Sequence, residues 1–194
     1  MRHPRLHSAL VKVAGSDSLS WLETQRLKLK LGLNPFTSIV KKDVPLNLFG
    51  EHAYPEEGGG GVVHINKDSS PSVVAHELGH LTHGKNRLEL ALTRMSNSLA
   101  PLAKIAPGLI AAATDPDSDA SKYAPVLGGV LAAPKLVSEG LASYRGLKAL
   151  KEIRPDASIL PAVLAQLTYP AYLLGGGVVV PYFIRKTKKE REDR

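Results

Sequence analysis

The segment His76-Glu77-Leu78-Gly79-His80 has residue types and a spacing that suit metal-assisted hydrolysis. Histidines four positions apart lie one turn apart on the same face of a helix, so both imidazoles can reach one metal ion. Glu77 is rotated away from that pair but lies close enough to take a proton from water at the metal. Zinc lowers the pKa of such a water and polarises a peptide carbonyl. The motif therefore predicts peptide-bond hydrolysis, with His76 and His80 as zinc ligands and Glu77 as general base.

A five-residue match can also arise by chance on an amphipathic helix. The flanking sequence favours the metal interpretation, because Val62–Ile65 predicts a strand just before the motif. Ser69-Ser70 can cap a following helix, and Pro71 suits its first turn. We expect that helix to run to about His83, with Gly84 as a left-handed stop.

A catalytic zinc site needs a third protein ligand and one open position for water. His83 is close in sequence, but it lies about 10 Å along the helix axis from His76. Zinc–nitrogen bonds are about 2.1 Å long, so one unbroken helix cannot aim all three rings at one ion. Glu139 is the better candidate, and we expect it to open a helix after an apolar stretch. An ordinary acid that stabilises a helix N-terminus is the alternative interpretation of Glu139.

Neighbours of Glu139 suggest how this second helix supports the site. Ser143 lies one turn beyond Glu139, where its hydroxyl could orient a ligand histidine. The small residues Gly140 and Ala142 would allow close packing against the motif helix. The group that stabilises the oxyanion stays open among His52, His64, Tyr144 and Arg145.

The elements around these residues are short. We expect a helix over about 19–31 that ends at Gly32, with Ser16, Asp17 and Ser18 as capping candidates. Strands are expected at 38–41 and 44–49, and a polar loop with flexible glycines at 51–61. Apolar stretches follow at 99–113 and 124–137, then a polar helix at 138–153 and an apolar segment at 159–184.

Composition limits the alternatives. The chain has 194 residues and no cysteine, which excludes disulfides and thiolate metal ligands. Its net charge of +7 is scattered apart from a C-terminal run, and no aromatic-interleaved basic patch is present, so we do not expect nucleic-acid binding. No apolar segment of signal-peptide length follows the basic N-terminus, so a cleaved secretion signal is not expected.

The uncharged segment 159–184 is long enough to span a bilayer, and a basic tail follows it. Prolines interrupt the segment, and Gly175–Gly177 could turn it back on itself. We expect a membrane-associated protein with its catalytic face toward the cytoplasm. The alternative is that all three apolar stretches are core or subunit-interface helices of a soluble protein.

Four segments in order resemble the membrane-associated neutral zinc metallopeptidases of the YugP-like type. Glu51–Pro55 resembles the family's DHYDP loop, and Val73–His80 its AAHEVGH helix. Glu139–Arg145 resembles the EFxASRRAL segment, and Ala165–Tyr169 the AALTY segment. The resemblance covers about residues 17–184.

This resemblance implies a zincin fold of the gluzincin kind, with His76, His80 and Glu139 as ligands and Glu77 as catalyst. The chain departs from the family at His83, where glutamine is usual, and after Glu139, where Gly140 and Leu141 replace larger or acidic residues. It also lacks the N-terminal membrane helix common in the family, which bears on membrane topology and leaves the metal site unaffected.

Together these observations predict an α+β, mostly helical, zincin-like protein with a small N-terminal sheet. The expected parts are a basic arm at 1–15, a metallopeptidase domain at 16–158 with an apolar helical hairpin at 99–137, an apolar helical segment at 159–184, and a basic tail at 185–194. We expect a zinc-dependent endopeptidase that acts on a peptide or protein, and an oligomer or larger assembly stays open. The substrate would pair with an edge strand formed by Val62, Val63, His64 and Ile65.

Two hypotheses of other classes compete with this one. A structural or assembly protein could keep the zincin fold, with zinc only structural or absent. A basic membrane-surface anchor without chemistry would explain the tail, but it would leave the arrangement of the motif and Glu139 without a purpose.

Overall fold

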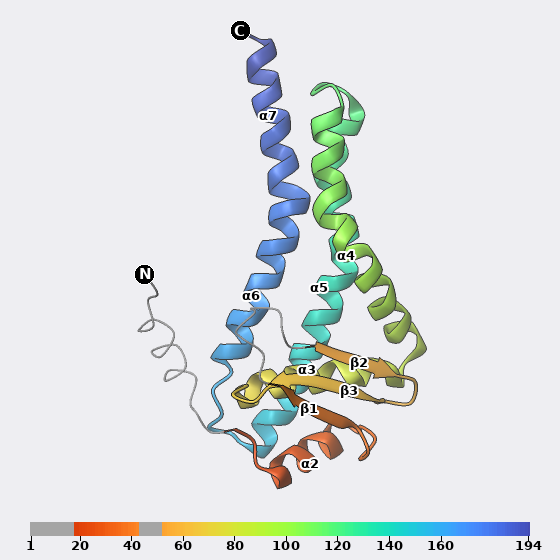
Figure 1. The fold of residues 1–194 in the computed structure, drawn as a ribbon, viewed down its shortest axis with the longest axis vertical. Helices are drawn as coiled ribbons and strands as arrows, with labels where there is room; N and C mark the ends of the chain where they lie inside the picture. The colour runs from red at the N-terminus through yellow and green to blue at the C-terminus, as the bar shows by residue number, and fades with distance from the viewer. Residues whose placement is uncertain (1–17, 43–51) are drawn as a thin grey trace. The chain divides into compact units, whose positions relative to one another are not determined.

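The computed structural model describes residues 18–42 and 52–194, and these form a mostly helical α+β protein with one small sheet (Figure 1). This confirms the predicted class. The chain divides into two compact units, one from Met1–Leu90 with Glu139–Gln166 and the other from Ala91–Ser138 with Leu167–Arg194. We call them the first and the second unit. The predicted basic arm at 1–15 and strand at 44–49 lie outside the described residues.

The sheet belongs to the first unit and has the order β1-β3-β2. Its strands are β1 (Ser38–Lys42), β2 (His52–Glu56) and β3 (Gly60–Asn66), with β1 parallel and β2 antiparallel to β3. Residues 52–56, expected to be loop, therefore form a strand. The reason lies in the pairing, because His52 and Tyr54 stand opposite His64 and Val62 on one face of the ladder. That partnership cannot be read from the local composition of the segment.

The expected edge strand is in fact the central strand. Val62–Ile65 lies in β3, which is hydrogen-bonded to β1 on one side and to β2 on the other. Its backbone groups are therefore already paired, and an extended peptide cannot be added to it. Among the described residues the edges of the sheet are β1 and β2.

The helices of the first unit begin with α2 (Trp21–Lys30), where Ser20 and Glu23 form a capping box. The N-cap is thus slightly later than the serines proposed from sequence. Gly32 ends the helix with a φ of 61°, as expected for a left-handed stop. The core of this unit joins α2, the sheet and two further helices, and its fully or nearly fully buried members include Leu27, Val63, Ile65, Leu78, Leu81 and Leu150.

The motif helix is α3 (Pro71–Leu81), capped by the Ser70 side chain and followed by the 3₁₀ turn η1 (Thr82–Lys85). Gly84 does not have a positive φ, so it is not the left-handed stop we expected. A Cβ atom there would lie 1.8 Å from the Glu56 carbonyl oxygen. Glycine is needed at this position because η1 packs directly on the end of β2.

Helix α5 (Asp119–Ile153) is continuous through Pro125 and Pro134. Glu139 therefore lies inside a helix and does not open one, so the interpretation of Glu139 as a helix N-terminal acid is wrong. The sequence changes from apolar to polar at Ser138, but the helix continues through this residue. Helix α4 (Arg87–Ala113) likewise extends further than the apolar stretch that predicted it.

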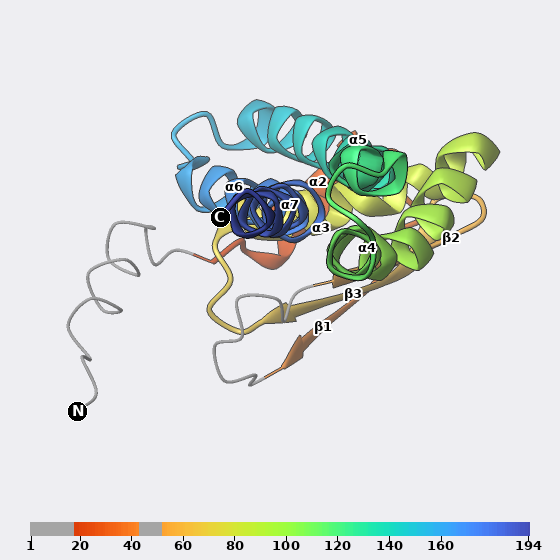
Figure 2. The same ribbon diagram turned by 90° about the horizontal axis from the view of Figure 1, so that it is seen from above.

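The expected apolar segment is divided among α6 (Leu160–Leu174), the π-helical turn η2 (Gly175–Val179) and α7 (Val180–Glu192), and its residues from Leu167 onward belong to the second unit. The triple glycine does not reverse the chain. A Cβ at Gly177 would lie 2.4 Å from the Ala103 carbonyl oxygen, and a Cβ at Gly128 would lie 1.8 Å from the Gly177 carbonyl oxygen. The glycines therefore permit close contacts of η2 with α4 and α5. In Figure 2, α7 and the parts of α4 and α5 next to their connecting loop are seen end on.

No helix within 18–42 and 52–194 is both long and apolar enough to cross a membrane. The predicted basic tail continues α7 as helix. Arg185 and Lys188 donate to backbone carbonyls around the loop between α4 and α5, and Lys189 forms a 2.7 Å ion pair with Asp117 in that loop.

Candidate metal centre

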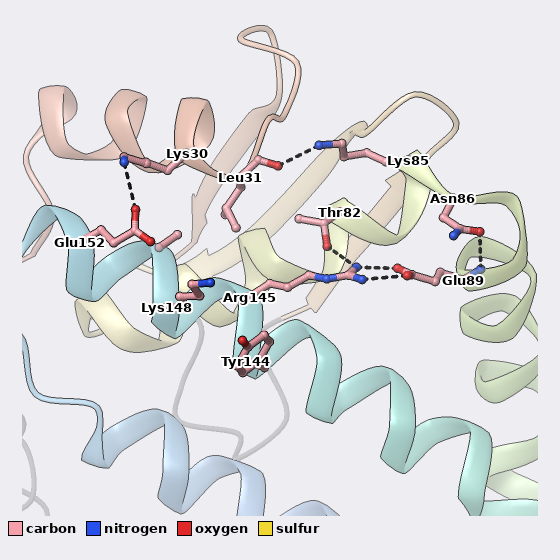
Figure 3. A pocket seen from close by; sticks show the side chains of 11 residues that line it. Lys30, Leu31, Thr82, Lys85, Asn86, Glu89, Tyr144, Arg145, Lys148 and Glu152 are labelled. Carbon is pink, nitrogen blue, oxygen red and sulfur yellow. Dashed lines mark hydrogen bonds and ion pairs between the residues drawn. The ribbon is translucent and has the colours of Figure 1, made fainter.

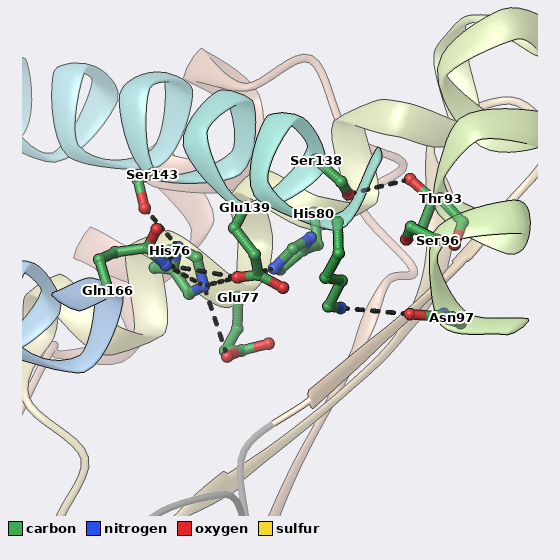
Figure 4. A network of polar contacts seen from close by, with 11 residues as sticks. His76, Glu77, His80, Thr93, Ser96, Asn97, Ser138, Glu139, Ser143 and Gln166 are labelled. Atoms are coloured by element: carbon green, nitrogen blue, oxygen red, sulfur yellow. Dashed lines mark hydrogen bonds and ion pairs between the residues drawn. The ribbon is translucent and has the colours of Figure 1, made fainter. Parts of the chain in front are cut away.

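The structure brings His76, His80 and Glu139 together, and one ligand atom from each lies within 4.8 Å of the others. Glu139 Oε2 is 3.3 Å from both His76 Nε2 and His80 Nε2. The three residues are only 4–7% exposed. Figure 4 shows the two rings on α3 meeting the carboxylate from α5. All three belong to the first unit.

These separations fit a metal ion. Zinc bonds to histidine nitrogen and carboxylate oxygen are about 2.0–2.1 Å, so ligand atoms at tetrahedral angles stand about 3.4 Å apart. Both nitrogen–oxygen separations of 3.3 Å agree with that value. Two imidazoles and one carboxylate suit zinc and also other divalent transition metals. The group could therefore hold a metal ion.

Close contact between α3 and α5 creates this arrangement. A Cβ atom at Gly79 would lie 2.1 Å from the Ala142 carbonyl oxygen, and a Cβ at Gly146 would lie 2.0 Å from the Ala75 carbonyl oxygen. The expected packing through small residues is therefore present at Ala142. It does not involve Gly140, where a Cβ would meet nothing within 4 Å.

Ser143 lies where sequence reasoning put it, beside a ligand histidine. Its Oγ is 2.9 Å from His76 Nδ1. When Nδ1 carries the proton and donates to Oγ, the lone pair of Nε2 is directed to the metal position. This contact can fix both the tautomer and the orientation of the His76 ring.

Glu77 is 6% exposed, and its Oε1 lies 3.9 Å from His76 Nε2. The carboxylate thus borders the ligand atoms without belonging to the metal-binding group. A carboxylate beside these ligand atoms could accept a proton from a water held there.

Gln166 on α6 is a member of the site that sequence reasoning missed. Its side-chain Nε2 lies 3.3 Å from Glu139 Oε2 and 3.3–3.4 Å from the two ring nitrogens of His76. The segment 165–169 drew attention only through the family resemblance, which gave Gln166 no role. No local spacing could have indicated it, because Gln166 lies 90 positions beyond His76.

His83 is not part of the metal-binding group, as its spacing predicted. It is buried, with only 1% of its surface exposed. Burial, followed by the charge of nearby His80, lowers the pKa of His83 to about 4. Its ring meets that of His80 edge to face, with centroids 5.5 Å apart. His83 therefore packs as a neutral ring behind a ligand.

None of the four oxyanion candidates has a contact with the three metal-binding residues among the hydrogen bonds and ring contacts described below. Arg145 binds both carboxylate oxygens of Glu89 and also donates to Thr82 Oγ1 at 3.1 Å. It lines a separate pocket of about 520 Å³ together with Tyr144, as Figure 3 shows. His52 and His64 stack on each other, with ring centroids 4.8 Å apart, on the sheet face opposite the buried Val63.

Comparisons of the chain with protein-family models, with curated proteins and with solved structures give no match.

Proposed function

We propose that this protein is a zinc-dependent endopeptidase with a zincin-like catalytic unit. The observation that carries the proposal is the buried group of His76, His80 and Glu139 with the Glu77 carboxylate beside it. The resemblance of four ordered segments to the YugP-like metallopeptidases supports the same activity and the gluzincin ligand set. A zinc ion held by the three ligands would supply Lewis acidity for water and for the peptide carbonyl.

The residues of the chain divide the remaining work. Glu77 accepts the proton of the attacking water and later delivers it to the leaving amine. Ser143 holds the His76 ring in one orientation through the 2.9 Å contact at Nδ1. The burial of Glu77 and of the three metal-binding residues keeps bulk water away from the reacting groups, which strengthens electrostatic interactions there.

The edge strand β2 is the place we propose for the substrate backbone. β2 pairs only with β3 among the described residues, and α3 contacts both strands. A substrate in extended conformation could add to the outer edge of β2 through main-chain hydrogen bonds. This replaces the original assignment of Val62–Ile65, because that strand has no free edge.

We also propose that the protein associates with a membrane, its catalytic face toward the cytoplasm. The helices of the second unit carry many exposed large apolar side chains, which include Leu102, Ile105, Leu109, Val126, Val130 and Phe183. A large number of exposed apolar side chains favours contact with lipid or with another protein. The same surface is compatible with an oligomer.

Metal analysis combined with two variants tests the peptidase proposal. We expect about one zinc per chain in the wild type and clearly less in Glu139→Ala, since one of three ligands is lost. Glu77→Gln should keep the metal and lose at least about 100-fold in cleavage of a peptide library, because the general base is removed. Unchanged cleavage by Glu77→Gln would overturn the mechanism.

A structural role for the metal is the second candidate, and the burial of the site favours it. Ligands that are only 4–7% exposed resemble a closed structural site as much as a catalytic one. This candidate predicts that zinc binds and that its removal lowers the melting temperature. It also predicts that neither the wild type nor Glu77→Gln cleaves any peptide.

A further inference from the structure

Lys28 is a buried cation that the metal centre does not use. It lies on α2, is 6% exposed, and donates from Nζ to the Thr37 carbonyl oxygen at 2.7 Å. No carboxylate forms an ion pair with it within the described ranges. Burial lowers the pKa of its ammonium group. Burying an ammonium group without a counter-charge costs folding free energy, so a ligand that supplies a negative charge would offset this cost.

Lys28 lines a pocket of about 390 Å³ in the first unit, which we call the Lys28 pocket. Two more lysines, Lys41 and Lys67, line the same pocket, and no carboxylate from the described residues does. The rest of the lining is largely apolar and includes Leu19, Trp21, Ile39, Ile65 and Val74. The pocket thus combines positive charge with an apolar wall.

The neighbouring pocket of Figure 3 provides a contrast. It also contains several cations, but its Arg145 binds Glu89, and its Lys30 forms a 2.9 Å ion pair with Glu152. The charges of Arg145 and Lys30 are thus compensated within the protein. In the Lys28 pocket neither Lys28 nor Lys41 has a carboxylate partner among the described residues, so an anion from outside can supply it.

The hydrogen-bonding capacity of Lys28 points the same way. An ammonium group has three N–H donors, and the Thr37 carbonyl uses one of them. An anionic oxygen could accept a charge-assisted hydrogen bond from another donor and offset the cost of burial. The apolar wall around Trp21 would meanwhile cover a hydrocarbon or aromatic body.

We propose that the Lys28 pocket binds an amphiphilic organic anion, with a phosphate or carboxylate head at Lys28 and an apolar body against Trp21 and Ile39. This site is distinct from the metal centre, and the proposal does not depend on peptidase activity. The competing explanation is that Lys28 only ties α2 to the segment before β1 through the Thr37 carbonyl. The two explanations differ in what they predict for ligand binding.

Trp21 makes the test direct, because it is the single tryptophan of the chain and it lines the pocket. Its fluorescence would be followed while full-length protein is titrated with octyl phosphate, below the concentration at which micelles form. Octyl glucoside provides the apolar chain without charge, and inorganic phosphate provides the charge without the chain. We expect saturable binding of octyl phosphate, and at least about 10-fold weaker binding of either partial ligand.

Lys28→Met keeps the aliphatic stem and removes the charge, and it should weaken octyl phosphate binding at least 10-fold. Lys30→Met is the matched control on the same helix, since Lys30 is half exposed and paired with Glu152, and it should bind like the wild type. Should Lys28→Met fail to fold, Lys41→Met tests the same charge from an exposed position, with an expected loss of about 3-fold. Equal binding of octyl glucoside and octyl phosphate would overturn the proposal, and so would unchanged binding by Lys28→Met.

Vesicles distinguish the two sources of such an anion. Binding to phosphatidic-acid vesicles but not to phosphatidylcholine vesicles would identify a lipid headgroup as the ligand. Binding of soluble octyl phosphate without vesicle binding would identify a free small-molecule anion. Either result supports the shared chemistry of the site.

Discussion

Replacing Gly79 with alanine should separate the two helices that carry the metal ligands. The added Cβ would lie 2.1 Å from the Ala142 carbonyl oxygen, whereas ordinary contact begins near 3.4 Å. The position of the Cβ is fixed by the α3 backbone and the oxygen belongs to the α5 backbone, so no flexible side chain can relieve the clash. Helix α3 must therefore shift by about 1 Å away from α5. Overpacking of this kind costs about 1–3 kcal/mol of folding stability.

The same shift should damage metal binding. Glu139 Oε2 lies 3.3 Å from both histidine nitrogens, and ligand distances tolerate only about ±0.2 Å. A displacement of about 1 Å exceeds this range several-fold, so at least one ligand would be lost. We expect zinc affinity to fall at least about 100-fold, a larger loss than the removal of a single hydrogen-bonding neighbour of a ligand usually causes.

Gly140→Ala is the matched control for Gly79→Ala. A Cβ at Gly140 would meet nothing within 4 Å, and the residue lies in α5 beside Glu139. Alanine there should raise stability by up to about 1 kcal/mol through helix propensity and leave the metal site intact. Zinc affinity would be measured by competition with a chromophoric chelator, and stability by urea unfolding of the metal-free protein. Equal zinc affinity of the two variants would refute the proposed role of the helix contact.

Two further predictions concern neighbours of the site. Gln166→Met keeps the side-chain length but removes the amide near Glu139 and His76, so zinc affinity in the chelator competition should fall about 10-fold. Unfolding of the metal-free variant should match the wild type, and a parallel loss of stability would assign Gln166 a purely structural role. Glu89→Gln should cost about 1 kcal/mol at pH 7, because Arg145 loses a charged partner that is partly exposed. Hydrogen bonds from Arg145 lower the pKa of Glu89, so its contribution is present above about pH 4.5 and is lost as the pH falls through the lowered value. Urea unfolding at a series of pH values should therefore show that the free energies of unfolding of the wild type and Glu89→Gln become equal in acid. A difference that does not change with pH would contradict the proposed contribution of the ionised Glu89 carboxylate.

The parts of the site that depend on one helix could be predicted from sequence. The spacing of His76 and His80 places both rings on one face whatever the rest of the fold does. Glu139 does lie beside the two histidines, as predicted, but it lies within α5 and does not open a helix. The order of the strands could not be predicted, because the sequence indicates that Val62–Ile65 forms a strand but does not indicate which strands lie beside it. Gln166 was out of reach for the same reason, since its approach depends on how α6 returns to α3 and α5.

A signal for the helix contact was nonetheless present in the sequence. Ala75 and Gly79 are four positions apart on α3, and Ala142 and Gly146 are four apart on α5. Gly79 meets Ala142 while Gly146 meets Ala75, so the two helices cross antiparallel with small residues at both contacts.

Each histidine directly follows one of these small residues on α3, and Ser143 directly follows Ala142 on α5. An antiparallel crossing at this register brings Ser143 to His76 and Glu139 to His80, which agrees with the distances of 2.9 and 3.3 Å. The small-residue pairs thus set the register that turns a two-histidine motif into a three-ligand site. A bulky residue at either glycine should therefore remove metal binding even though every ligand is still present.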